Sequence, residues 1–372
     1  MRKRWVVSTL LAAVVAIASA AAVATHASAA PKQTHLTKVI LQSKWVPQAQ
    51  FAGYYTALAK GFYKRAGLDV TIKPGGPDII PEQVVASGQA QFGLDWLPSL
   101  LSARDKGTDL VNISQVFARS GMTELTWKDS GVDAIAKMKD KKVGNWLGGN
   151  EFELFAALTK NGMDPAQNKG VTIVQQDFTM NAFLNRQIDA ASAMTYNELA
   201  QVLEAKNPKT GKLYTLADLN VIKMQNVGTG MLEDGIFTTG KYLKSAANRA
   251  TAVKFIGASL AGWIYCRDHV TECVSIVLKQ GPTLPKGHQT WQMNEINKLV
   301  WPNKTGIGVM NTADFNRTAK IAQQFGVIKK APTGAYRTDL AKLAVAGLKL
   351  NHQDVFGKKY KPMTVKLTEG GK

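Results

Sequence analysis

The sequence predicts an α/β protein built from two lobes with a hinged cleft, followed by a set of C-terminal helices. The chain has 372 residues, and the roughly 340 that follow a predicted leader exceed what one hydrophobic core comfortably holds. Short apolar runs typical of buried strands alternate with helix-length segments, which predicts a parallel sheet with crossover helices. This alternation starts twice, and from Lys241 onward the pattern is almost wholly helical.

The first strand–helix set is expected over residues 39–106 and the second over residues 142–224. Strands are expected at 39–42, 68–73, 92–95, 111–117, 124–127, 142–146, 171–175, 190–194 and 220–224. Helices are expected at 51–65, 82–87, 97–106, 150–161, 180–186, 197–205, 247–266, 271–280, 290–299 and 313–325.

The chain is expected to cross between the lobes twice, near residues 119–126 and 226–231, which makes a natural hinge. The predicted division is a signal peptide at 1–29, the first part of lobe one at 30–120, lobe two at 121–229, and a return to lobe one at 230–372.

The first thirty residues have the features of an export signal. A basic start at residues 2–4 precedes an apolar run over 5–24, and Ala27-Ser28-Ala29 offers the small-residue pattern that signal peptidase recognises. The apolar run alone would also suit a membrane anchor, but the cleavage-like site favours a signal peptide. We therefore expect a soluble, periplasmic protein.

The net charge of +19 suits a nucleic acid, an acidic membrane surface or an anionic ligand as partner. The basic residues are scattered, however, and no arginine-rich run with interleaved aromatic residues occurs. We therefore expect no nucleic-acid binding and interpret the excess as a solvated surface that can steer anions.

Cys266 and Cys273 are the two cysteines of the chain. In one straight helix their Cα atoms would lie about 10 Å apart, too far for a disulfide. The residues between them read as a break between two helices, with Asp268 or Thr271 as N-cap, and such a hairpin would bring the thiols together. In an oxidising compartment we favour a disulfide over two free thiols. A zinc site with His269 lacks a fourth ligand.

Candidate ligand-binding residues follow from the rule that ligands of open α/β sheets lie beyond the carboxyl ends of strands. Indole and phenol rings recur at these ends beside amides and carboxylates, a combination that suits a planar heterocycle with polar edges. The candidates are Trp45, Gln48, Tyr54, Gly76, Asp95, Trp96, Trp146, Asn150, Tyr196 and Glu198.

Several candidates also have purely structural interpretations. Trp45 and Trp146 could pack in the core, and Asn150 followed by Glu153 matches a helix-capping pattern. Gly75-Gly76 could supply a turn with positive φ, or a close approach to a ligand. Glu198 could stabilise a helix dipole. Of Tyr54 and its neighbour Tyr55, one is expected to face the cleft and the other the core.

Catalytic arrangements are sparse in the sequence. No histidine occurs between His35 and His269, so the two lobes lack the usual general base. A nucleophile elbow, a phosphate-binding loop and a paired-histidine metal motif are also missing. We therefore expect a binding protein rather than an enzyme, with no cofactor and no metal.

The stretch from Trp45 to Tyr55, which reads WVPQAQFAGYY, is followed by Gly61-Phe62-Tyr63 and later by QVVASG at residues 83–88. With Phe92-Gly93, these residues resemble the thiamine-pyrimidine-related (SsuA/THI5-like) branch of the type II periplasmic binding proteins. The resemblance covers nearly all of the predicted mature chain. It implies two lobes around a hinged cleft and an ABC permease in the inner membrane as partner. We expect a monomer that binds a small-molecule ligand.

The resemblance also implies residue roles. Trp45 matches a ring-stacking tryptophan, Gln48 a polar residue at the start of the first helix, and Glu198 lies near a carboxylate that binds an aminopyrimidine. Thiamine-precursor binders tend to carry Asp before the tryptophan, where this chain has Lys44. The expected ligand is a thiamine pyrimidine precursor. The alternatives are riboflavin or another pyrimidine, a sulfonate or nitrate held by Arg119, and a pyrimidine-synthase enzyme.

Overall fold

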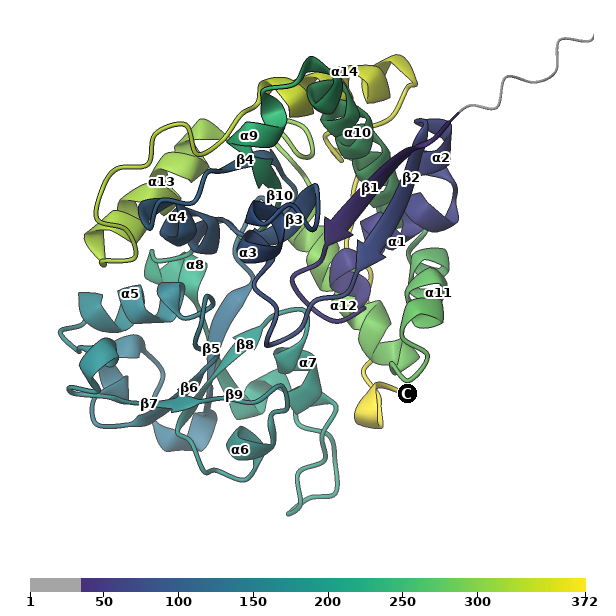
Figure 1. Ribbon diagram of the computed structural model, residues 1–372. Coiled ribbons are helices and arrows are strands. Elements are labelled where there is room, and N and C mark those ends of the chain that lie inside the picture. Colours follow the sequence, from purple (N-terminus) through teal and green to yellow (C-terminus); the bar gives the residue numbers. More distant parts are fainter. Residues whose placement is uncertain (1–34) are drawn as a thin grey trace, which may run out of the picture. The chain divides into compact units, whose positions relative to one another are not determined.

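The computed structural model describes residues 35–372, and within it Leu36–Lys372 form one compact unit. The predicted signal peptide lies outside the described residues. Ten strands form two five-stranded sheets in this part of the chain. In Figure 1 the sheet that contains β1 and β2 and the sheet that contains β6 and β7 occupy different halves of the ribbon.

Sheet A has the order β2-β1-β3-β10-β4. β1 pairs in parallel with β2 and β3, whereas β10 runs antiparallel to both β3 and β4. The strands are β1 (Thr37–Gln42), β2 (Leu68–Lys73), β3 (Phe92–Trp96), β4 (Leu110–Gln115) and β10 (Asp234–Thr239).

Sheet B has the order β7-β6-β8-β5-β9 and the same arrangement of directions. β6 is parallel to β7 and β8, and β5 is antiparallel to β8 and β9. The strands are β5 (Met122–Trp127), β6 (Lys142–Asn145), β7 (Thr172–Gln175), β8 (Ala190–Met194) and β9 (Leu219–Lys223). The expectation of parallel sheets is therefore wrong, since each sheet contains one antiparallel strand.

The two antiparallel strands carry the chain between the sheets. The chain leaves sheet A at the end of β4 and enters sheet B at β5, whose first residue Met122 lies opposite Met194 at the end of β8. It returns from β9 to β10, whose first residue Asp234 lies opposite Trp96 at the end of β3. Both crossings therefore join the carboxyl edge of one sheet to the carboxyl edge of the other.

Helices follow the strands in the order that the sequence pattern predicts. Short helices occupy the strand connections: α1 (Ala52–Ala59), α2 (Phe62–Arg65), α3 (Pro81–Ala86), α4 (Leu97–Asp105), α5 (Phe152–Lys160), α6 (Asn181–Leu184), α7 (Glu198–Leu203) and α8 (Met224–Val227). Another short helix, α9 (Gly240–Leu243), follows the last strand, β10. Longer ones close the chain: α10 (Ala246–Asp268), α11 (Val270–Gln280), α12 (Lys286–Val300), α13 (Thr312–Gln324) and α14 (Asp339–Leu350). The single helix expected over 51–65 is broken because Gly61 adopts φ 70°.

Cys266 and Cys273 form a disulfide with Cα atoms 5.5 Å apart, as predicted. Cys266 lies in the last turn of α10 and Cys273 in the first turns of α11, and the break at His269 folds the helices back on each other. The capping prediction is wrong, because His269 is the N-cap and no side chain caps this end.

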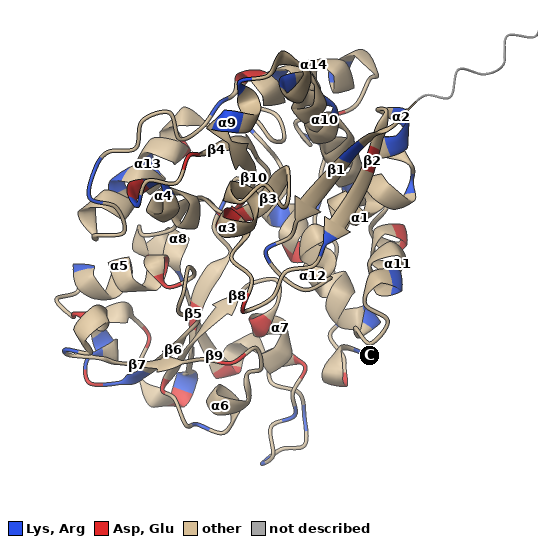
Figure 2. Cartoon of the chain, in the orientation of Figure 1, with Lys and Arg blue, Asp and Glu red and all other residues tan. Residues whose placement is uncertain are grey.

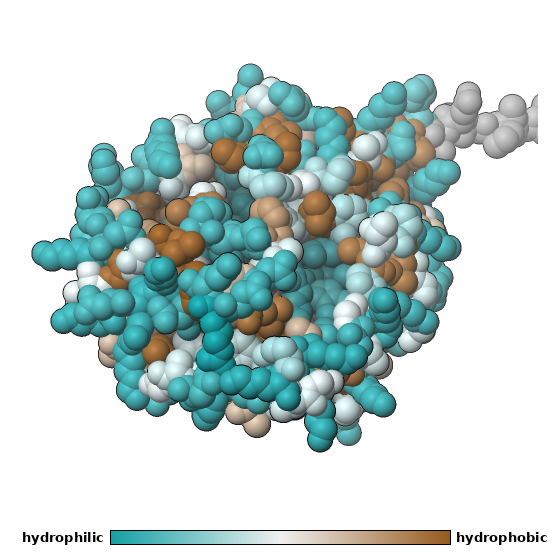
Figure 3. All heavy atoms as spheres, turned by 90° about the horizontal axis from the view of Figure 1, so that it is seen from below, coloured by the Kyte–Doolittle hydropathy of each residue, from teal (hydrophilic) through white to brown (hydrophobic). Residues whose placement is uncertain are grey.

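The surface charges are distributed over many elements. In Figure 2 the Lys and Arg residues are scattered along the ribbon of both sheets and the C-terminal helices. Figure 3 shows a largely hydrophilic face with a few separate hydrophobic patches. Within residues 35–372 no helix is both long and apolar enough to cross a membrane.

The helix pair α1–α10 depends on two glycines that face each other. A Cβ on Gly262 would lie 2.0 Å from the carbonyl oxygen of Gly53, and a Cβ on Gly53 would lie 2.4 Å from the ring of Trp263. Glycine at these positions lets the two helices touch backbone to backbone, which fixes α1 against the long helix.

Gly262→Ala should lower the free energy of unfolding by about 3 kcal/mol, because the added methyl group forces these backbones apart. Gly257→Ala is the matched control on the same helix, since its Cβ would lie 3.7 Å from Ala344, an ordinary contact distance. The control should be neutral or gain up to about 1 kcal/mol from better helix propensity. Urea unfolding of both variants measures the difference, and equal stability would contradict the proposed close packing.

Candidate functional site

A cavity of about 750 Å³ lies where loops from both sheets meet. It is lined by residues at or just beyond the ends of β1, β3, β6 and β8, so it lies at the carboxyl ends of strands from both sheets. This position follows from the topology, since the two crossings bring these edges together.

Most of the predicted ligand-binding residues line this cavity. Those that do are Trp45, Gln48, Gly76, Asp95, Trp96, Trp146, Asn150, Tyr196 and Glu198. Their contact with a ligand stays a prediction, but their common location is a finding.

Tyr54 does not line the cavity. It lies on α1, is 1 % exposed and packs edge-on against Trp263 with ring centroids 5.8 Å apart. Tyr55 is buried as well, so the expectation that one of the pair faces the cleft is wrong. The reason is the close α1–α10 contact, which draws the tyrosine-bearing part of α1 into the core.

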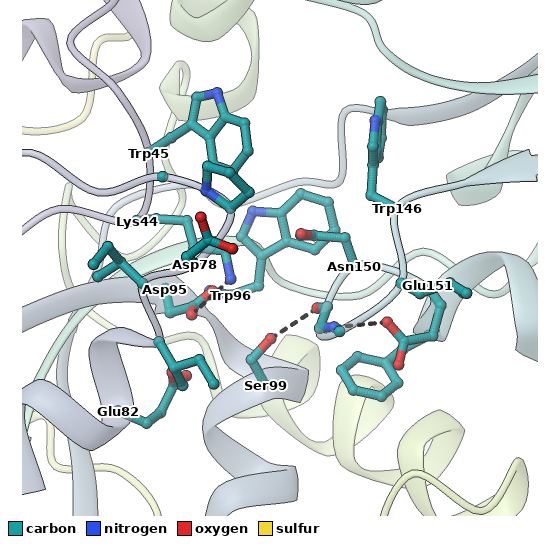
Figure 4. A pocket seen from close by; sticks show the side chains of 18 of the residues that line it. Lys44, Trp45, Asp78, Glu82, Asp95, Trp96, Ser99, Trp146, Asn150 and Glu151 are labelled. Atoms are coloured by element: carbon teal, nitrogen blue, oxygen red, sulfur yellow. Dashed lines mark hydrogen bonds and ion pairs between the residues drawn. The ribbon is translucent and has the colours of Figure 1, made fainter. Parts of the chain in front are cut away.

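Three indole rings surround the cavity: Trp45 and Trp96 from sheet A and Trp146 from sheet B (Figure 4). Trp45 and Trp146 are only half-buried, so their ring faces remain available. The indole N–H of Trp146 donates to the carbonyl of Asp177 at 3.2 Å, which fixes that ring. Flat apolar walls of this kind suit a planar guest.

Two contacts join loops of the two sheets across the cavity. The Ser99 hydroxyl on α4 donates to the carbonyl of Gly149 at 2.8 Å, as Figure 4 shows. The ring of Trp45 meets that of Phe178 edge-on, with centroids 4.5 Å apart. Ser99 and Phe178 were not predicted. Each lies three residues beyond the end of a strand, and the partners that bring them to the cavity lie far away in the sequence.

Lys44 was noted in the sequence only as a departure from a family pattern, yet it lines the cavity. Its ammonium group lies 2.9 Å from Oδ2 of Asp95, and the two side chains are 13 % and 1 % exposed. The pair forms because β1 and β3 are neighbours in sheet A, so Lys44, just after β1, meets Asp95 near the end of β3.

Glu198 opens α7, and both of its carboxylate oxygens have partners within its own turn. Oε2 accepts from the backbone N–H of Met194 at 2.9 Å, and Oε1 accepts from the Asn197 amide at 2.6 Å. Burial raises the pKa of Glu198 to about 7, although these hydrogen bonds oppose the rise. The carboxyl group thus stabilises its own loop while it faces the cavity.

Gly75 and Gly76 both lie outside the positive-φ region, so the turn explanation is wrong. A Cβ on Gly75 would lie 2.3 Å from the carbonyl carbon of Lys44, so glycine is required by the approach of another backbone segment. Gly76 has no heavy atom near its Cβ position and lines the cavity.

Two further expectations are wrong. Asn150 and Glu153 do not form a capping box, because α5 begins at Phe152 and its N-cap Glu151 makes no side-chain cap. Arg119 is not a cavity residue: its guanidinium donates to backbone carbonyls between residues 298 and 302, including that of Pro302 at 2.6 Å. An anion in the cavity would therefore lack the arginine that the sequence offered.

Metal binding has no support among residues 35–372, where no three His, Cys, Asp or Glu side chains gather in a way that could hold an ion.

The family profile described as "NMT1/THI5 like" matches residues 48–272, more than half of the chain. The chain belongs to the NMT1/THI5-like family.

Relatives of this NMT1/THI5-like protein include binding proteins and enzymes. The chain is 24% identical over 320 residues to the riboflavin-binding protein RibY of Chloroflexus aurantiacus. This match covers 83% of the chain and 86% of RibY. The chain is 27% identical over 109 residues to the 4-amino-5-hydroxymethyl-2-methylpyrimidine phosphate synthase THI11 of Saccharomyces cerevisiae, covering 29% of this chain and 32% of the enzyme.

Its fold matches the periplasmic aliphatic sulphonate-binding protein SsuA of Escherichia coli, with a TM-score of 0.59 at 14% sequence identity over 88% of this chain and 94% of SsuA. The predicted type II periplasmic binding protein fold is confirmed.

Two buried carboxyl groups accept hydrogen bonds from the segments in which the chain crosses between the sheets. Glu153 accepts from the Ser120 hydroxyl at 2.7 Å and from the N–H of Met231 at 2.9 Å. Glu233 accepts from the N–H of Gly121. Burial raises the pKa of Glu153 to about 8, and burial together with the nearby Glu153 holds the pKa of Glu233 well above its ordinary value.

The raised pKa of Glu153 predicts that stability falls as pH rises. Between pH about 4.5 and about 8 the folded state holds a proton that the unfolded state has lost. The free energy of unfolding should therefore decrease across this window, by on the order of a few kcal/mol. Glu153→Gln should flatten part of this dependence, because the amide does not titrate. Its oxygen can accept from the N–H of Met231, and its NH2 group can donate to the Ser120 hydroxyl oxygen.

Urea unfolding at several pH values between 4.5 and 8 provides the measurement. Glu369→Gln, at a carboxylate whose side chain is 63 % exposed, is the control and should leave the pH slope unchanged. An unchanged slope in Glu153→Gln would show that Glu153 is ionised in the folded protein.

Proposed function

We propose that this protein is the extracytoplasmic solute-binding component of an ABC importer and that it binds a planar nitrogen heterocycle of flavin size, with riboflavin as the first candidate. The observation that carries the proposal is the indole-walled cavity of about 750 Å³ between the carboxyl edges of the two sheets. This volume lies in the range of roughly 300–1,000 Å³ that is typical of sites for drug-sized ligands.

The cavity size favours a fused ring system over a single pyrimidine ring. One six-membered ring would leave most of the space to water, whereas a tricyclic isoalloxazine with its side chain could reach Trp45 on one side and Trp146 on the other. The long match to RibY, over 83% of this chain, supports the same choice. The match to the pyrimidine phosphate synthase covers 29%.

A thiamine pyrimidine precursor is the second candidate. Glu198 lines the cavity and a carboxyl group there could accept hydrogen bonds from an amino-substituted ring. Its oxygens already accept from Met194 and Asn197, which leaves less capacity for a ligand.

The lining of the cavity favours binding over catalysis. Among the described residues, no histidine and no cysteine lines it, so the common general base and the common nucleophile are absent there. We propose that the protein releases its ligand unchanged to a permease.

Closure of the two lobes is the proposed mechanism. We propose that lobe one consists of residues 30–120 and 230–372 and that lobe two consists of residues 121–229. The two chain crossings between them would act as the hinge. In the closed arrangement the Ser99–Gly149 hydrogen bond and the Trp45–Phe178 ring contact would hold the loops over the ligand. Residues 1–29 would direct export, and the mature protein would act as a periplasmic monomer.

A thermal-shift titration with riboflavin tests the proposal. Riboflavin at one hundred times its dissociation constant should add about 2.7 kcal/mol to the stability of the wild-type protein. Trp45→Ala should lose most of this gain, because it removes one stacking wall, whereas Trp45→Phe should keep part of it. Flavin fluorescence, which indole stacking quenches, gives a second readout of the same complex.

Phe62→Ala is the matched control, since Phe62 is a half-buried aromatic residue outside the cavity lining. It should bind riboflavin like the wild type. A wild-type protein that binds neither riboflavin nor an aminopyrimidine, or that converts either one, would refute the proposed function.

A further inference from the structure

Among residues 35–372, the one largely buried lysine of the cavity wall has its charge balanced without a ligand. Lys44 follows β1, and its ammonium group donates to Asp95 at 2.9 Å. Within residues 35–372 Asp95 is the single hydrogen-bond partner of this ammonium group, which has three N–H donors. The side chain is 13 % exposed, so the remaining donors can be reached only from the cavity.

Asp95 supplies an acceptor directly beside these donors. Its Oδ1 accepts from the backbone N–H of Trp96 at 2.6 Å, and its Oδ2 accepts from Lys44. Each carboxylate oxygen can take a second hydrogen bond. The two residues thus present a donor next to an acceptor, as Figure 4 shows at the base of the indole walls.

Glu82 provides a second observation that points to a missing partner. It lines the cavity and is 4 % exposed, and its carboxyl group lies beside that of Asp95. Its Oε1 accepts no hydrogen bond from an N–H or O–H group of the described residues. A buried polar atom without a partner costs about 1–3 kcal/mol, so a ligand that supplies the missing hydrogen bond gains affinity. Burial, with the neighbouring Asp95, also raises the pKa of Glu82 well above its ordinary value.

The charges that face the cavity do not favour an anion. The lining contains the ammonium groups of Lys44 and Lys106 and the carboxyl groups of Asp78, Glu82, Asp95, Glu151 and Glu198. Even if Glu82 and Glu198 are protonated, the remaining carboxylates are at least as many as the ammonium groups. The buried cation, Lys44, is already paired with Asp95, and Lys106 is exposed to solvent, so a phosphate or sulfonate would lose its hydration without gaining a buried, unpaired cation.

We propose that the Lys44–Asp95 pair determines ligand specificity by recognising an uncharged heterocycle whose edge has a hydrogen-bond acceptor beside a donor, and that the cavity rejects phosphorylated and sulfonated molecules. The carbonyl and N–H of a flavin's pyrimidine ring form such an edge. This inference rests on the proposed function and adds the ligand's charge and edge pattern to it.

The test compares riboflavin, riboflavin 5′-phosphate and ethanesulfonate by isothermal titration calorimetry. Wild-type protein should bind riboflavin at least about tenfold more tightly than its 5′-phosphate and should not bind ethanesulfonate. Asp95→Asn keeps the acceptor for Trp96 but frees the Lys44 charge. It should weaken riboflavin binding about tenfold, as expected for a lost charged hydrogen bond, and strengthen binding of the 5′-phosphate relative to riboflavin.

Lys44→Met should weaken riboflavin binding without any gain for the anions. The matched controls are Lys137→Met and Asp133→Asn, which remove members of an ion pair with the same 2.9 Å separation but with side chains 55 % and 56 % exposed. Both controls should leave all three titrations unchanged. Thermal unfolding of each variant checks that it is folded.

A second measurement needs no variant. Because the pair is neutral as a unit, wild-type affinity for riboflavin should be nearly independent of salt concentration, whereas binding governed by a free cation would weaken with salt.

The outcomes separate the two proposals. Riboflavin binding with equal or better binding of its 5′-phosphate, or an unchanged ligand preference in Asp95→Asn, would overturn the inference and leave the proposed function standing. Ethanesulfonate binding without riboflavin binding would overturn both.

Discussion

The directions of β5 and β10 are the constraint on which the site depends. Each pairs on both sides and runs antiparallel to both neighbours, so each begins at the edge where the parallel strands end. The chain therefore crosses from carboxyl edge to carboxyl edge, both ways. Loops that would lie on separate surfaces in two independent sheets are thereby forced to share one cavity. The indole rings, the Lys44–Asp95 pair and the Ser99–Gly149 contact all depend on this shared edge.

The sequence predicted the parallel strands and most helices because those elements carry local signals. β3 is a short buried run and α4 follows it directly with Pro98 in its first turn. β10 was missed because Asp-Gly opens it and two threonines end it, so it resembles a loop. What makes it a strand is pairing with β3 and β4, which lie far earlier in the chain. Such nonlocal pairing leaves no periodic pattern at the strand itself.

The candidate site was predictable to the extent that it follows the strand-end rule. Trp45 and Trp146 lie just after strands, Trp96 is the last residue of β3, and all three line the cavity. Tyr54 was misplaced because helical periodicity gives two faces but does not say which one another helix will bury, and here α10 decided it. Lys44 follows β1 and Glu82 lies on α3, and both become important because they meet Asp95 on β3. No spacing along the chain shows that these residues meet.

The net charge of +19 favours an anionic ligand, whereas the charges that line the cavity favour an uncharged one. The distance from each charge to the bound ligand decides which effect prevails. Exposed charges are screened beyond a Debye length of about 8–10 Å, so scattered surface lysines can attract an anion to the protein but contribute little to its energy once bound. Inside the cavity the dielectric is lower and each group is within direct reach. There the one buried cation is already paired with Asp95, and an uncompensated carboxyl oxygen of Glu82 lies nearby. Whole-chain charge therefore bears on the rate of encounter, while the local balance at Lys44 governs which molecule stays.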